Sequence, residues 1–251
     1  MTSAMIPFAI ALLFAVVFMF RFRMFLWRRA CRGGAETIYS DLVATFSGPH
    51  EYRAKLREET AGIDWSEYDR VRLEMQTRGF TDLGGMEDVT MGRAKPQSPN
   101  FLELYSGLDG TVMVATYNAY GVHVVDCMSE TPDGRLLITT NAEMNKLSPP
   151  SNWRAETRSS ETQCGELLDL HLSRLRALRE TERGTHLIPI RSLEDAMESA
   201  MRCSAASSEH RRSIGLLTRD ELAALTGPGQ ESAAELVWLE FCRIREEKRA
   251  A

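Results

Sequence analysis

The sequence predicts an α+β protein with one N-terminal transmembrane helix, followed by a four-stranded antiparallel meander packed with helices on both sequence flanks. Three observations predict this fold class. The run Ile6–Phe20 contains no charged residue and precedes several arginines. Two Asp-Gly pairs, which favour tight hairpin turns, lie within Phe101–Asn141. Apolar residues recur at helical spacing on both sides of that segment.

The N-terminal apolar run predicts a membrane anchor. Ala4–Phe20 supplies seventeen apolar residues, close to the roughly 20 that a helix needs to cross a bilayer. A cleavable signal peptide would carry its basic residues before the run, whereas here they follow it. A buried core helix is disfavoured, because five arginines would adjoin a packed interior.

The basic residues after the run predict its orientation. Lys and Arg near a span stay on the cytoplasmic side, so we expect a single-pass protein with its N-terminus outside and a cytoplasmic C-terminal domain. The residues expected at the membrane interface are Arg21, Arg23, Trp27, Arg28, Arg29 and Arg32.

We expect three segments along the chain. Residues 1–32 form the transmembrane anchor and basic juxtamembrane stub, and residues 33–150 form helices plus the antiparallel meander. Residues 151–251 form a C-terminal helical region that packs on the same domain. With about 220 residues after the anchor, the chain is long enough for one large domain or two small ones.

The part before the meander is expected to be mainly helical. Gly33–Gly34 is interpreted as a swivel, because glycine is conformationally permissive. Helices are predicted over residues 35–46, 49–60 and 64–79 from their apolar spacing and flanking Gly and Pro. The Gly- and Pro-rich stretch that follows is expected to be a loop with one short strand near Glu87–Met91.

The meander is predicted from its turns. Asp109–Gly110 and Asp133–Gly134 each connect two strand-like runs. The strands are expected at residues 101–106, 111–118, 122–128 and 135–140. In the second strand both alternating faces are rather apolar, so we expect helices to cover one face of the sheet and to cover the other face in part.

Four helices are expected after the meander. Capping boxes, in which two side chains satisfy each other's backbone N–H groups, are predicted here at Ser160 with Gln163, Ser192 with Asp195 and Thr218 with Glu221, and before the meander at Asp64 with Glu67. The four predicted helices cover residues 160–183, 193–207, 218–227 and 231–248.

Charge and cysteine content limit the possible functions. All 35 acidic residues but only 25 of the 30 basic ones lie after residue 32, so that part has a net charge near −10. An acidic surface disfavours nucleic acid, whose phosphates need a basic one. The five cysteines are widely spaced and form no C-x-x-C pair, which is typical of free thiols in a reducing compartment.

No motif in the chain assigns a reaction. The P-loop, G-x-G-x-x-G, G-x-S-x-G and H-E-x-x-H patterns are all missing from the sequence. The candidates for a catalytic role are His123, Cys127 and His171. On a strand, His123 and Cys127 share one face about 13 Å apart, too far for a direct nucleophile pair, and Asp126 points to the other face. No two histidines lie within four residues of each other, so we predict no metal site, and no cofactor is expected.

We expect a membrane-anchored, non-enzymatic module that binds a protein or has a regulatory role. Its expected partners are membrane lipid, through the N-terminal helix, and another protein, which would dock on the helices after Glu161. The alternative is a membrane-tethered hydrolase with a site near the meander, using His123, Cys127 or His171 with loop carboxylates. A third possibility is self-association through the anchor, although bulky side chains surround its small residues.

Overall fold

The computed structural model describes residues 5–96, 100–119, 121–182 and 184–250; for residues 5–18 and 20 it describes the backbone alone. Contacts within the chain divide it into two units. One is Ala44–Leu216, and the other combines Met1–Val43 with Leu217–Ala251. The first unit contains a β-sheet and its covering helices, and the second is helical. The chain is therefore α+β, as the sequence predicts.

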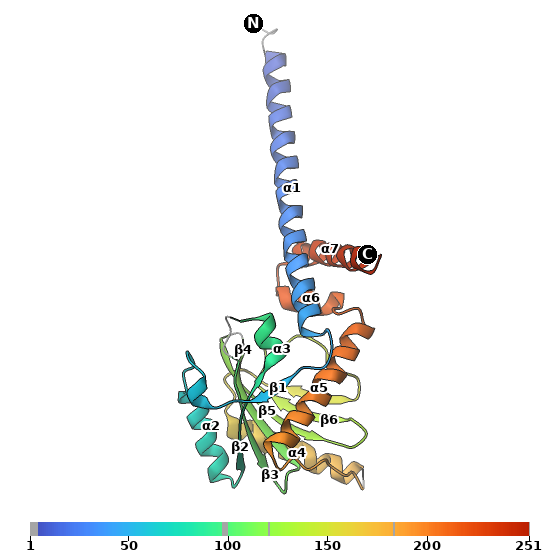
Figure 1. Cartoon of the computed structure of the whole chain (residues 1–251). Helices are drawn as coiled ribbons and strands as arrows, with labels where there is room; N and C mark the ends of the chain where they lie inside the picture. Colours follow the sequence, from blue (N-terminus) through green and yellow to red (C-terminus); the bar gives the residue numbers. More distant parts are fainter. Residues whose placement is uncertain (1–4, 97–99, 120, 183, 251) are drawn as a thin grey trace. The chain divides into compact units, whose positions relative to one another are not determined.

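The sheet of the first unit has seven strands in sequential order (Figure 1). Neighbouring strands are antiparallel except the last two, which are parallel. The strands are β1 (Tyr52–Ala54), β2 (Thr81–Asp88), β3 (Leu102–Gly107), β4 (Val112–Ala119), β5 (Val122–Glu130), β6 (Leu136–Thr140) and β7 (Trp153–Thr157).

The predicted four-stranded meander corresponds to β3–β6, but it is only part of the sheet. The prediction of four strands is wrong, because β1, β2 and β7 extend the sheet at both edges and make it mixed. The predicted Asp-Gly turns are present: the Gly110 N–H donates to the Gly107 carbonyl at 3.1 Å, so the central residues of the first turn are Leu108 and Asp109, both with positive φ. Positive φ at both central residues matches the right-handed twist of the flanking strands.

Helices cover both faces of this sheet. The helical elements of the unit are η1 (Arg57–Glu59), α2 (Ser66–Thr77), α3 (Val89–Ala94), α4 (Cys164–Thr181) and α5 (Leu193–Ser213). Helix α5 begins with the predicted capping box, in which the Ser192 hydroxyl accepts from the Asp195 N–H and the Asp195 carboxylate accepts from the Ser192 N–H. The helix predicted at 49–60 is wrong, since β1 and η1 occupy that stretch.

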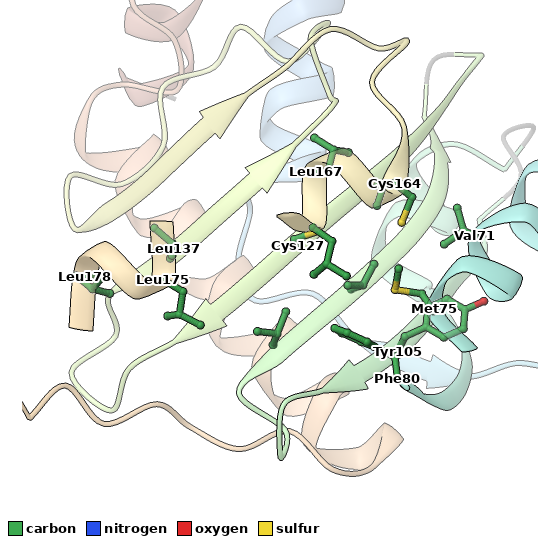
Figure 2. Close-up of a cluster of buried hydrophobic side chains, with 14 residues drawn as sticks. Val71, Met75, Phe80, Tyr105, Cys127, Leu137, Cys164, Leu167, Leu175 and Leu178 are labelled. Atoms are coloured by element: carbon green, nitrogen blue, oxygen red, sulfur yellow. The ribbon is translucent and has the colours of Figure 1, made fainter. Parts of the chain in front are cut away.

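One sheet face, called here the α4 face, carries the larger hydrophobic core (Figure 2). Alternation along the strands directs Val114, Val125 and Cys127 to this side, where α2 and α4 pack on them. Met75 of α2 and Leu167 of α4 are fully buried there. This interface is close-packed, as expected for the main core of a domain.

The opposite face, called here the α5 face, carries a smaller cluster. Met86, Leu104, Met113 and Ala115 point to it and Ala196 of α5 packs against them. Figure 1 shows α5 lying across the sheet. Because one helix cannot cover seven strands, part of this face has no helix over it, in agreement with the partial cover expected from the sequence.

The second unit contains three helices, α1 (Met5–Thr45), α6 (Arg219–Thr226) and α7 (Glu231–Ala250). Within it, Tyr39 of α1 meets Phe241 of α7 edge-to-face, with 5.7 Å between ring centroids. Helix α1 runs through Gly33–Gly34 without interruption, so the predicted swivel is wrong. Two glycines cost a helix about 1 kcal/mol each relative to alanine, which a long helix tolerates.

The predicted membrane anchor is contradicted. Among the residues the structure describes, no helix combines the length and the apolar character needed to cross a bilayer. The apolar run is shorter than the roughly 20 residues required, and α1 continues from it into exposed Arg21 and Arg23. Apart from exposed Met19, the side chains of the run lie outside the described residues. The predicted single-pass topology and its orientation are therefore wrong, whereas membrane lipid as a partner stays a prediction.

The residues predicted at a membrane interface lie on α1. Five of them are exposed to solvent: Arg21, Arg23, Trp27, Arg28 and Arg29. The sixth, Arg32, pairs with Glu36 one turn away at 3.0 Å and with Glu247 of α7 at 3.4 Å. Without a spanning helix the interface assignment loses its basis, and for Arg32 the structure shows ion pairs instead.

Candidate functional site

His123, the first catalytic candidate, lies on β5 and faces the α4 side of the sheet. Its Nε2 is 2.6 Å from the Thr116 hydroxyl, and its Nδ1 is 3.1 Å from the Asn118 side-chain oxygen. The ring also stacks edge-on against Tyr68, with centroids 4.8 Å apart. Burial lowers the pKa of His123. Each ring nitrogen thus has a structural partner.

Thr139 connects the surroundings of Cys127 with those of His171. Thr139 sits opposite Cys127 in the β5–β6 pairing, and its hydroxyl is 3.1 Å from Nδ1 of His171. The other ring nitrogen of His171 is 3.0 Å from the Ser129 hydroxyl. Two hydroxyl partners can satisfy a neutral imidazole, one as donor and one as acceptor.

Because Cys127 and His171 are buried, a substrate cannot reach either of them. Cys127 and His171 have no exposed surface, and Cys127 packs within the core of the α4 face (Figure 2). Burial raises the pKa of the Cys127 thiol well above its ordinary value. Burial first, and then the nearby Arg174 charge, lowers the pKa of His171 to about 3. A protonated thiol beside an engaged, neutral imidazole has no activated nucleophile to offer.

A cavity of about 860 Å³ lies on the α5 face, entirely within the unit Ala44–Leu216. We call it the α5 cavity. Its volume falls in the range of small-molecule sites. The apolar wall comes from four strands: Met86, Leu102, Leu104, Met113, Ala115 and Met128. Ala200, Cys203 and Ser204 of α5 line it from the helix side.

Asp126 is one of the ionisable groups that strands of the sheet present to this cavity, together with Asp88 of β2 and His123 of β5. Asp126 lies on β5 between Val124 and Met128, with Ala115 opposite it on β4. Its carboxylate accepts a hydrogen bond from the Tyr117 hydroxyl at 2.9 Å. Burial raises the pKa of Asp126, although the hydroxyls of Thr140 and Tyr117 oppose that shift.

A second set of polar residues, His50, Tyr52 and Asp88, lines another part of the cavity. Nδ1 of His50 lies 2.5 Å from the Asp88 carboxylate, and its Nε2 lies 2.6 Å from the Thr45 carbonyl. The His50 backbone N–H donates to Ser204 of α5 at 3.0 Å. These bonds tie the segment before β1 to the end of β2 and to α5. Tyr52 completes the group; burial and the Asp88 carboxylate raise its pKa.

Helix α5 is held over the cavity by a buried carboxylate. Glu130 of β5 accepts from the Ser199 hydroxyl at 2.7 Å and from the Arg202 guanidinium at 2.8 and 2.9 Å. Glu130 itself is buried, whereas the Arg202 side chain that donates two of these charge-assisted bonds is exposed. They fix the first half of α5 relative to the sheet, and Ser199 also lines the cavity.

The rim of the cavity is mainly acidic. Asp64 and Glu67, at the start of α2, lie there together with Lys95 and Gly121. Asp64 and Gly121 are exposed, so the cavity opens to solvent at this end. With Asp88 and Asp126 inside, four carboxyl groups line the cavity against Lys95 and the His50 imidazole. Such a lining favours cationic over anionic ligands.

The sequence reasoning missed most of this site. It placed Asp126 on the face away from His123, as the structure has it, but gave it no role. A carboxylate at an inward position of an otherwise apolar strand was the signal that could have identified it. His50, Tyr52 and Asp88 could not be grouped, because the predicted helix over 49–60 does not place Tyr52 beside Asp88.

No family model, curated protein or solved structure matches this chain, so its site is interpreted from its own residues. Across the residues the structure describes, no group of three or more His, Cys, Asp or Glu side chains is arranged to hold a metal ion.

Proposed function

We propose that this chain is a non-enzymatic binding or regulatory module that takes a small, mainly apolar ligand in the α5 cavity. The observation that carries the proposal is an 860 Å³ cavity with an apolar wall and a few polar groups, notably Asp126 and the His50–Asp88 pair. Small-molecule sites have this composition: apolar surface supplies affinity and a few polar groups fix orientation. Met86, Met113 and Met128 add a flexible, polarisable surface that adapts to different ligand shapes.

The geometry supports binding better than hydrolysis. The three catalytic candidates lie on the α4 face, where Cys127 and His171 are fully buried, and Asp126 lies on the other. Apart from His123 at the rim, none of the three lines the cavity. A protein partner on the helices after Glu161 stays a prediction that the cavity neither requires nor opposes.

The proposal is tested by filling the cavity. N-phenyl-1-naphthylamine, an uncharged dye that fluoresces in apolar surroundings, should bind the full chain saturably. Ala200→Trp places an indole in the cavity and should weaken binding by about tenfold or more. Ala177→Trp on the exposed side of α4 is the matched control and should bind as the wild type does.

Dye binding is compared only between variants that are shown to be folded. Circular dichroism and thermal unfolding establish that each variant keeps its fold, and Ser207→Trp, farther along α5, offers a second obstruction. Dye binding that is weakened equally by Ala177→Trp and Ala200→Trp, or no saturable binding by the wild type, would overturn the proposal.

A further inference from the structure

Asp126 is half-buried, and among the described residues it differs from the buried carboxylates of the same unit in having no cation paired with it. Glu103 pairs with Arg57 at 2.7 Å, Glu87 pairs with Lys55 at 2.6 Å, and Glu130 pairs with Arg202 at 2.8 Å. Asp88 has His50 at 2.5 Å. Among the described ion pairs none involves Asp126, whose partners are the hydroxyls of Tyr117 and Thr140.

An unpaired carboxylate in apolar surroundings is costly, because burial removes its hydration and nothing of opposite charge replaces it. Burial accordingly raises the pKa of Asp126. A cation brought in by a ligand would supply the missing charge, and its bond to the carboxylate would be charge-assisted. The buried carboxylates Glu87, Glu103 and Glu130 show how the chain resolves this cost elsewhere, with a cation of its own.

The surroundings of Asp126 have room for such a group. Ala115, directly opposite on β4, is the smallest side chain of its row, and Leu104 lies beyond it on β3. Met113 and Met128 pair with each other in the next row on the same face. A cationic head at Asp126 would therefore have an apolar surface immediately beside it for the rest of the ligand.

The entrance of the α5 cavity carries negatively charged side chains, which attract a cationic ligand. Asp64 and Glu67 at the rim raise the local concentration of cations, although Glu67 also pairs with Arg70. Lys95 is the lysine at the rim. Carboxyl groups therefore lie both at the rim of the cavity and, as Asp126, on its sheet wall.

We infer that the α5 cavity binds an amphipathic amine, with its ammonium group on the Asp126 carboxylate and its alkyl or aryl part on the wall formed by Leu104, Met113 and Met128. This inference rests on the proposed function and names the chemical class of its ligand. Tyr117 is a positioning residue, since its hydroxyl bonds to the carboxylate and directs it. The primary ammonium group donates three hydrogen bonds, so it can satisfy Asp126 and a neighbouring oxygen together.

The test uses three probes that share one chain length: dodecylamine, dodecanol and dodecanoate. Their affinities for the full chain are measured at pH 7 by displacement of N-phenyl-1-naphthylamine, below micelle-forming concentrations. The amine should bind about tenfold or more tightly than the alcohol, and the carboxylate should bind most weakly. Asp126→Asn should remove at least tenfold of the amine affinity and leave the alcohol within about threefold. Asp133→Asn, at an exposed turn, is the matched control.

The possible results separate the two proposals. If the alcohol binds but the amine binds no tighter, or if Asp126→Asn keeps the amine preference, the inference is overturned while the binding function stands. If none of the probes displaces the dye because the dye does not bind, the binding function itself fails and the inference fails with it. The wild-type series alone decides the amine preference, so a poorly folded Asp126→Asn variant does not remove the test.

Discussion

At the scale of single residues, His50 is the clearest case of geometry fixing a charge state. Both of its ring nitrogens lie within 2.6 Å of atoms that only accept hydrogen bonds, the Asp88 carboxylate and the Thr45 carbonyl. Both nitrogens must therefore carry a proton, which makes the ring an imidazolium. Burial lowers the pKa of His50, but the bonds to Asp88 and Thr45 outweigh it and the pKa is raised.

A raised pKa gives a defined pH dependence of stability. The contribution of His50 is fully present below the ordinary histidine pKa near 6.5, and it is lost as the pH rises through the higher folded-state value. His50→Gln should therefore destabilise the protein by about 3 kcal/mol at pH 6, because Asp88 is left without its cation. The loss should shrink at pH 9.

Urea unfolding of wild type and variant at both pH values checks this prediction. His186→Gln removes an exposed histidine and serves as the control. A His50→Gln loss that is the same at pH 6 and pH 9 would show that the imidazole is not charged in the folded protein.

For single residues, the sequence predicted on which face of the sheet a side chain lies, but not which residues it bonds to. Alternation along β5 correctly put His123 with Cys127 and Asp126 on the opposite side. It could not show that His171, on α4, bonds to Ser129 and Thr139, since those contacts depend on how the helix crosses the sheet. The pairing of His50 with Asp88 spans 38 residues and was equally out of reach.

At the scale of elements, local chemistry predicted the central hairpins and the starts of two helices. The Asp-Gly turns located β3–β6, and two capping boxes located the starts of α5 and α6. The capping boxes predicted at Asp64 and Ser160 are wrong: α2 begins after Trp65 and α4 after Gln163, and neither of these residues caps its helix with a side-chain hydrogen bond. The sequence did not predict β1 and β2, for the converse reason. β1 has three residues, and β2 contains Gly84 and Gly85, which weaken strand propensity. Both are strands because neighbouring strands pair with them.

Glycine at position 85 of β2 is explained by close packing, because the space beside its backbone has no room for a side chain. A Cβ at this position would lie 2.4 Å from the ring of Phe101 and 2.6 Å from the Lys55 carbonyl, part of the backbone. Gly85→Ala should therefore cost about 2 kcal/mol or more, because β1 and β2 must separate. Chemical denaturation measures the loss.

Gly33→Ala provides the comparison at the same scale. A Cβ at Gly33 meets nothing within 4 Å, and the residue lies inside α1. This substitution should stabilise the helix by about 0.5 to 1 kcal/mol, since alanine is the better helix former. Equal effects of the two substitutions would contradict the close packing described at β2.

At the scale of the whole molecule, the α5 cavity emerges from the arrangement of elements. The sequence predicted both sheet faces to be apolar and one to be only partly covered, which is the condition for a cavity. Its volume and lining depend on the path of α5, which Glu130 fixes through Ser199 and Arg202. That path is set by long-range contacts, and local patterns carry no information about them.

The central claim, that a small apolar ligand occupies the cavity, is tested most directly by methyl NMR of the full chain labelled at its methionines. Met86, Met113 and Met128 line the cavity, whereas Met75 lies in the core of the α4 face and Met144 is exposed. On titration with dodecanol, the methyl signals of the first three should shift saturably and those of Met75 and Met144 should stay in place. Unchanged signals from all five, or equal shifts at Met144 and Met113, would contradict the claim.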